Sequence, residues 1–86
     1  MLAGKLEHEV WVRLDSLEDL DLLVDSAQRW YFDIMVDCGA SLLNAKSGIL
    51  MKTVELSREY RVQIVYEKRD RQGVFDFIKM VAPILV

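Results

Sequence analysis

The sequence predicts an α+β fold in which a largely antiparallel sheet carries helices on one face. Two patterns predict this class. Several stretches alternate apolar and polar residues with a period of two, and others place apolar residues at helical spacing. In chain order the predicted elements are strand, helix, strand, strand, helix, strand and helix. Such a chain is expected to form two layers, a four-stranded antiparallel sheet and three helices packed on one of its faces.

Length and composition bound the class of protein. The 86 residues fit one domain, residues 1–86, and a chain that is 52% hydrophobic and 29% charged is typical of a globular protein. A net charge of −3 disfavours a nucleic-acid-binding surface, which is normally basic. No apolar run approaches the roughly 20 residues of a membrane span, and residues 1–7 lack the pattern of a signal peptide. The single cysteine, Cys38, excludes an intrachain disulfide, so we expect a cytoplasmic protein.

The first strand and the first helix follow from periodicity and capping. Residues 8–14 alternate, with Val10, Val12 and Leu14 on one face and Trp11 on the other. Ser16 is the expected N-cap of the helix, and an aspartate three residues later approximates a capping box. The apolar face of this helix is predicted at Leu17, Leu20, Leu23, Val24, Ala27 and Trp30 or Tyr31.

The rest of the chain contains a hairpin, a short helix, a long strand and a final helix. Residues 31–37 and 42–43 are predicted strands joined by a turn at 38–41. Ser47 is the expected cap of a helix that runs to about residue 54. Residues 58–67 give the clearest alternation, and residues 68–73 are interpreted as a charged turn. The last helix is predicted from Val74 to Ala82 and ends at Pro83.

No residue pattern indicates catalysis. The chain lacks a glycine-rich phosphate loop, a nucleophile–base pair and a metal-ligating set, so we expect no enzyme activity, cofactor or metal. His8 is the only histidine and has no base or cation close in sequence. No pattern assigns a role to Trp11, Trp30 or Cys38. A group of basic residues is interpreted as a solvated face, namely Arg58, Arg61, Lys68, Arg69 and Arg71.

The stretch Asn44-Ala45-Lys46-Ser47 resembles the corresponding stretch of HPr, the small phosphocarrier of the bacterial sugar phosphotransferase system. Phe32-Asp33-Ile34 and the turn at Gly39 can be laid against that family without a gap. The order of elements matches the family from end to end. The resemblance therefore implies the HPr-like open-faced sandwich.

The resemblance also implies where a phosphate would be carried. The first helix of HPr opens with Gly-(Leu/Ile)-His-Ala-Arg-Pro, and its histidine is phosphorylated during sugar uptake. Here Ser16 stands at the histidine position, Glu18 at the arginine position and Asp19 at the proline position. A serine cannot form the labile phosphoramidate, and carboxylates repel a phosphoryl group. We therefore expect no phosphocarrier activity and interpret Ser16 as a helix cap.

In HPr the serine that corresponds to Ser47 is the target of a regulatory kinase. Lys46, Ile49 and Lys52 are candidate partner-binding residues, because the positions after that serine form an apolar partner-binding patch in the family. Gly48 and Lys52 interrupt this patch here, so Ile49 is expected as its remaining exposed apolar residue.

A regulatory HPr paralogue of bacilli, the catabolite-repression type, also lacks the histidine, and Val12-Arg13-Leu14 is similar to its first strand. The resemblance implies a bacterial regulatory or interaction module whose partner is HPr kinase or a transcriptional regulator. Two alternatives remain open from the residues. One is a ferredoxin-like small-ligand-sensing module, whose strand order would differ. The other is an active phosphocarrier that uses another residue.

Overall fold

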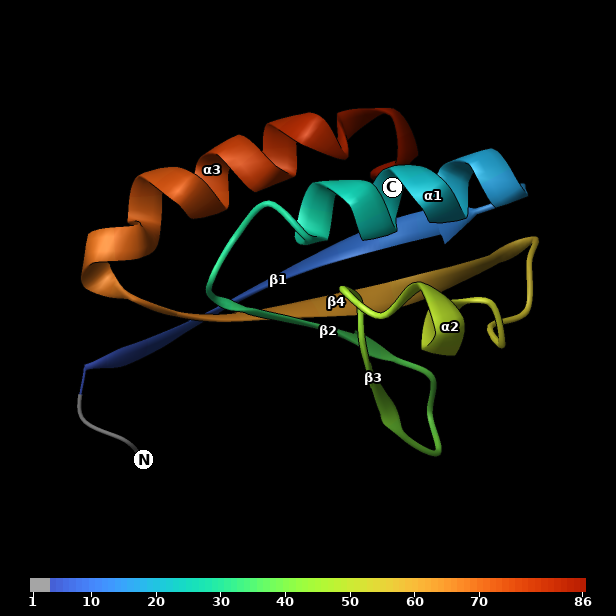
Figure 1. The fold of residues 1–86 in the computed structure, drawn as a ribbon, viewed down its shortest axis with the longest axis horizontal. Helices are drawn as coiled ribbons and strands as arrows, with labels where there is room; N and C mark the ends of the chain where they lie inside the picture. Colours follow the sequence, from blue (N-terminus) through green and yellow to red (C-terminus); the bar gives the residue numbers. More distant parts are fainter. Residues whose placement is uncertain (1–3) are drawn as a thin grey trace.

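The computed structural model describes residues 4–86, and the predicted order of elements is confirmed (Figure 1). The strands are β1 (Lys5–Leu14), β2 (Asp33–Asp37), β3 (Leu42–Asn44) and β4 (Arg58–Glu67). The α-helices are α1 (Leu17–Ala27), α2 (Gly48–Met51) and α3 (Arg71–Met80). Two 3₁₀ turns, η1 (Lys68–Asp70) and η2 (Ala82–Ile84), flank α3. No helix in this part of the chain is long and apolar enough to cross a bilayer.

The four strands form one antiparallel sheet in the order β1-β4-β2-β3. β4 pairs with β1 from Lys5↔Glu67 to Leu14↔Arg58, and with β2 from Asp33↔Val65 to Asp37↔Arg61. The last strand therefore lies between the first two. In a ferredoxin-like sheet the third strand occupies that place, so the ferredoxin-like alternative is wrong.

Three helices cover one face of the sheet and leave the other face without a helix (Figure 1). The core lies between these layers, and the alternating residues of the strands enter it as predicted. The buried residues include Val12, Leu14, Leu20, Leu23, Val24, Ile34, Val36, Val62, Ile64 and Phe77 of the strands and helices, and Val81 just after α3. Val10 shares their face but is only half-buried at the margin of the core.

The first two helices are shorter than predicted. α1 ends at Ala27, because Trp30 leaves the helical path and stacks on Phe32, with ring centroids 5.7 Å apart. Tyr31, placed between these two rings in the sequence, is fully exposed rather than part of a helix or strand. α2 is a single turn that ends at Met51, and the Thr53 hydroxyl donates to the Leu50 carbonyl at 2.6 Å just beyond it.

The predicted charged turn at residues 68–73 is wrong. Lys68–Asp70 form a 3₁₀ turn, and α3 begins directly after it at Arg71. Gly73 lies in the first turns of that helix rather than in a loop. A Cβ atom at Gly73 would lie 3.2 Å from the rings of Trp30 and Phe32. The glycine therefore permits close packing of α3 on the aromatic pair. α3 ends at Met80, before Pro83, which lies in η2.

Candidate functional site

The two candidate phosphate positions lie at the starts of helices, Ser16 at α1 and Ser47 at α2. The end of α1 is tied to the second position, since Gln28 Nε2 donates to the Lys46 carbonyl at 2.9 Å. The loop after α2 returns to the start of α1, because the Ser57 N–H donates to the Leu14 carbonyl at 2.6 Å. α2 and its loop therefore run beside α1 from one of its ends to the other.

The start of α1 is closed by its own side chains. Ser16 Oγ accepts the Asp19 N–H at 3.2 Å, which confirms the predicted cap. Asp19 Oδ2 accepts the Asp15 N–H at 2.9 Å, whereas a capping box would direct this carboxylate to the backbone of Ser16. The N–H groups of Asp15 and Asp19 are thus already paired with oxygens of this chain.

A cation does lie beside this helix start, but it is neutralised. Arg13 Nε contacts Asp15 Oδ1 at 2.8 Å, and Arg13 Nη1 lies 3.7 Å from Glu59 Oε2. Arg13 Nη2 also donates to the Ser57 carbonyl at 3.4 Å. Sequence reasoning missed Arg13, because Glu59 and Ser57 reach it only through the pairing of β1 with β4.

His8 is not part of this site. It is an exposed residue of β1 and pairs with Ile64 of β4. Leu14, at the end of the same strand, is about 20 Å away at the usual rise per residue. The structure therefore does not bring the histidine to the helix start.

Ser47 caps α2 as predicted. Its Oγ accepts the Leu50 N–H at 3.2 Å, and its own N–H donates to the Asn44 carbonyl at 3.0 Å. The Asn44 side chain accepts the Lys46 N–H at 2.9 Å and so shapes the turn that delivers Ser47. Ser47 itself is half-buried. Within residues 4–86, neither Lys46 nor Lys52 forms a salt bridge.

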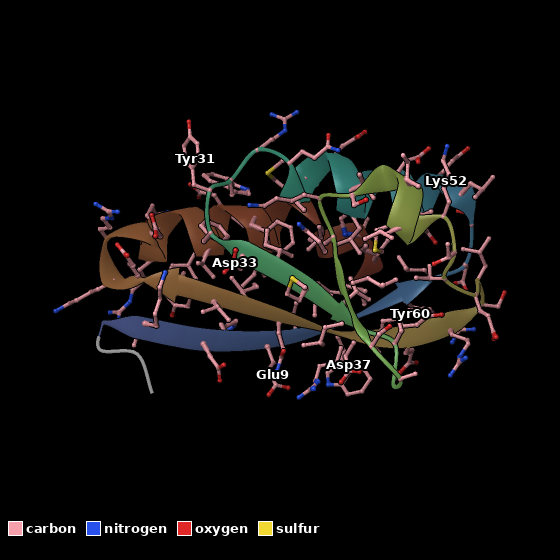
Figure 2. All side chains as sticks on the ribbon, turned by 60° about the horizontal axis from the view of Figure 1, so that its bottom comes forward. Glu9, Tyr31, Asp33, Asp37, Lys52 and Tyr60 are labelled. Atoms are coloured by element: carbon pink, nitrogen blue, oxygen red, sulfur yellow. The ribbon has the colours of Figure 1, made fainter. Side chains whose placement is uncertain are left out.

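The helix side exposes more apolar surface than the sequence indicated. Ile49 is exposed as predicted, at 84%. Leu50 is 44% exposed, so the prediction that Ile49 is the one exposed apolar residue left in the patch after Ser47 is wrong. Leu17, at the start of α1, is also exposed, at 64%. Leu17 shares helical spacing with the core residues of α1 but stands in its first turn, beside exposed capping residues. Figure 2 shows Lys52 on the same helix-covered side of the molecule.

Two further reactive side chains, Cys38 of the β2–β3 turn and Tyr60 of β4, line the same surface hollow. Burial, together with the charge of Asp37, raises the pKa of the Cys38 thiol, which disfavours a reactive thiolate. Burial likewise raises the pKa of Tyr60, whose hydroxyl donates to the Glu55 carbonyl at 2.6 Å. Over residues 4–86, no group of three or more His, Cys, Asp or Glu side chains is arranged to hold a metal ion.

Surface hollows of 260 to 310 Å³ lie away from the two helix starts. One hollow lies between the β2–β3 turn and the loop after α2, with Ser41, Arg58 and Tyr60 in its lining. Another surrounds Tyr31 and the start of η1. Ser16 and Ser47 line neither of these hollows.

No model of a known protein family matches the chain, and no curated protein matches it. Among solved structures, the chain is similar to the phosphocarrier protein HPr from Bacillus anthracis str. Ames, with a TM-score of 0.62 and 17% sequence identity. The likeness covers 90% of this chain and 96% of that chain. A likeness at this identity establishes architecture and leaves activity to be argued from the site. The chain has the HPr-like open-faced sandwich fold that its sequence resemblance implied.

Proposed function

We propose that this chain is a bacterial, cytoplasmic HPr-like module of one domain that regulates or binds a protein and does not carry phosphohistidine. The observation that carries this proposal is the capped, acidic start of α1. By the sequence resemblance Ser16 corresponds to the family's histidine, and its Oγ accepts the Asp19 N–H at 3.2 Å. A phosphocarrier needs an imidazole nucleophile at this place and free N–H groups around it.

The charges at the start of α1 support the same conclusion. Glu18 and Asp19 follow Ser16, and Asp15 precedes it. Arg13, the guanidinium beside them, is bound to Asp15 at 2.8 Å and lies near Glu59. An incoming phosphoryl group would meet carboxylates whose nearby cation is already paired, so transfer to this position is electrostatically unfavourable.

Ser47 is the proposed regulatory phosphorylation site. Its place at the start of α2 tolerates added negative charge, because the free N–H groups of a helix start favour anions. Lys46 directly precedes Ser47, and neither Lys46 nor Lys52 forms a salt bridge among the residues that the structure covers. Modification would change the surface beside Ile49 and Leu50 without disturbing the core. The proposed partners are HPr kinase, which would modify Ser47, or a transcriptional regulator, which would bind this surface.

The first experiment tests phosphotransfer. The protein is incubated with enzyme I and labelled phosphoenolpyruvate, and an active HPr serves as the positive control. We expect no acid-labile, alkali-stable label on this chain. Label at a stoichiometry similar to that of the control would overturn the non-catalytic assignment.

The second experiment tests Ser47. Intact mass is measured after incubation with HPr kinase and ATP, for the wild type, Ser47→Ala and the matched variant Ser41→Ala. We expect the mass of one phosphate on the wild type and on Ser41→Ala, and none on Ser47→Ala. No shift in the wild type, or a shift that persists in Ser47→Ala, would leave Ser47 as a structural cap.

A further inference from the structure

The face of the sheet that no helix covers carries an ordered pattern of side chains. Residues that alternate with the buried ones point to this open face, and Figure 2 shows Glu9 and Asp37 on it, away from α1 and α3. Because paired residues of neighbouring strands share a face, the strand register arranges these side chains in rows across the sheet.

One row across the open face is apolar at both ends and charged in the middle. It runs from Trp11 to Arg61, Asp37 and Leu42, one residue from each strand in the order β1-β4-β2-β3. Trp11 and Leu42 are each 50% exposed. Arg61 Nη2 lies 2.6 Å from Asp37 Oδ2 between them. A half-exposed tryptophan is a residue type that interfaces favour.

This row is complementary in charge and in apolar character to the same row of a second copy that runs in the opposite order. Consider a second copy whose open face meets this one. The two-fold axis lies midway between the two sheets, parallel to the strands and above the gap between Arg61 and Asp37, and it reverses the order of the residues in the row. Trp11 then faces the partner's Leu42, and Arg61 faces the partner's Asp37. An axis perpendicular to the strands would instead place Arg61 against the partner's Arg61. Charge complementarity therefore selects the first arrangement.

The neighbouring rows accept the same arrangement. The next row is Glu9, Gln63, Met35 and Asn44, so reversal places Glu9 against an amide and Gln63 against a thioether. The row beyond is Glu7, Val65 and Asp33, and here Val65 faces the partner's Asp33 while Glu7 has no β3 residue opposite it. No two like charges oppose each other in these three rows. Two sheets stacked about 10 Å apart with nearly aligned strands are a common packing geometry.

We propose that the open face binds a second copy of this chain and forms a two-fold symmetric dimer centred on Trp11, Arg61, Asp37 and Leu42. The face spans roughly 14 Å across four strands and about 30 Å along β4, so it covers at most roughly 400 Å² per copy. The roughly 800 Å² that two copies would bury lies below the standard size of specific interfaces, so the proposed dimer is a weak one, with a Kd in the micromolar to millimolar range. This proposal does not depend on the proposed function, because Ser16 and Ser47 lie on the helix side.

Sedimentation equilibrium tests the dimer. The protein concentration runs from about 10 μM to 1 mM, so that it covers the Kd expected for a small interface. We expect the wild type to dimerise in this range and Trp11→Ser to weaken association by about tenfold or more. Phe75→Ser is the matched control, because Phe75 is 48% exposed but lies on α3. A wild type that stays monomeric, or a Phe75→Ser variant as impaired as Trp11→Ser, would overturn the proposal.

A charge-exchange experiment tests the register. In Arg61→Asp alone, the carboxylate at position 61 faces the partner's Asp37, and in Asp37→Arg alone two cations face each other. We expect each single variant, verified as folded by circular dichroism, to be monomeric. A mixture of the two variants restores both opposite-charge pairs and should form heterodimers. Because neither variant dimerises alone, association in the mixture must come from contacts between the two chains. Mixtures that remain monomeric while both variants are folded contradict this arrangement.

Discussion

Asp19 accepts the backbone N–H of Asp15 at 2.9 Å, and this contact closes the start of α1. The same aspartate donates its own N–H to Ser16 Oγ at 3.2 Å. One residue therefore takes part in both of these hydrogen bonds. They stabilise the start of α1, and the carboxylates gathered there disfavour a bound phosphate.

Restoring the histidine alone is not expected to restore phosphotransfer. In Ser16→His, Asp19 still holds the Asp15 N–H and Glu18 still opposes a phosphoryl group, so label from phosphoenolpyruvate and enzyme I should stay undetectable. The triple variant Ser16→His, Glu18→Arg, Asp19→Pro removes both obstacles and should accept more label than the single variant. Labelling of Ser16→His at the rate of an active HPr would contradict the closed helix start.

Ser47→Ala should lower the free energy of unfolding by roughly 0.5–2 kcal/mol, because the Leu50 N–H loses its side-chain acceptor. Ser47→Asp should be neutral or slightly stabilising, since aspartate caps well and adds favourable charge to the helix start. Urea unfolding measures both values. Ser41→Ala is the control, since Ser41 is exposed and its hydroxyl forms no hydrogen bond among the described residues. An equal loss in Ser41→Ala and Ser47→Ala would rule out a specific cap.

Gly73→Leu should destabilise the protein by about 1–3 kcal/mol, the range for overpacking. The added side chain meets the rings of Trp30 and Phe32, where a Cβ atom alone would already lie 3.2 Å away. Gln72→Leu, an exposed neighbour on α3, should change stability much less. In a Trp11→Phe background, Gly73→Leu should also shift the emission of Trp30. Unchanged emission and stability would show that α3 does not rest on the aromatic pair.

The Asp37 carboxyl should make stability depend on pH on the acid side. The Gly39 N–H and the Arg61 guanidinium hold the pKa of Asp37 below its ordinary value of 3.8. A depressed pKa contributes stability that is present above the ordinary value and is lost as the pH falls through the folded-state value. The stability difference between wild type and Asp37→Asn should therefore be constant from about pH 5 to 7 and shrink below about pH 4.

An NMR titration of Asp37 checks the cause of this shift. In Arg61→Gln the pKa of Asp37 should rise toward 3.8 but stay below it, because the Gly39 N–H still donates to Oδ1 at 2.8 Å. An unchanged pKa in Arg61→Gln would contradict a contribution from the guanidinium.

Properties that depend on a few neighbouring residues could be predicted from the sequence. Ser16 and Ser47 each accept an N–H three residues ahead, so their capping role follows from local chain geometry. The alternation at residues 58–67 likewise predicts one buried face, and β4 shows it, because alternation along a strand decides which side chains share a face. The same local reasoning failed at Leu17, which shares helical spacing with the buried residues of α1 but is 64% exposed.

The tertiary structure decided the features that depend on partners far apart in the sequence. The sequence pattern places Gly73 in a turn. In the structure it lies in α3, where its lack of a side chain lets the helix pack closely on the rings of Trp30 and Phe32. Arg13 finds Glu59 only because β1 pairs with β4.

The row from Trp11 through Arg61 and Asp37 to Leu42 joins residues of four strands, and it exists only in one strand order and one register. The physical reason is the range of the interactions. A cap or an alternating face is set by torsions and hydrogen bonds within one turn or one strand. The neighbours across a sheet are set by pairing between strands that many residues separate, and a slip of one residue in that pairing would bring a different set of side chains together.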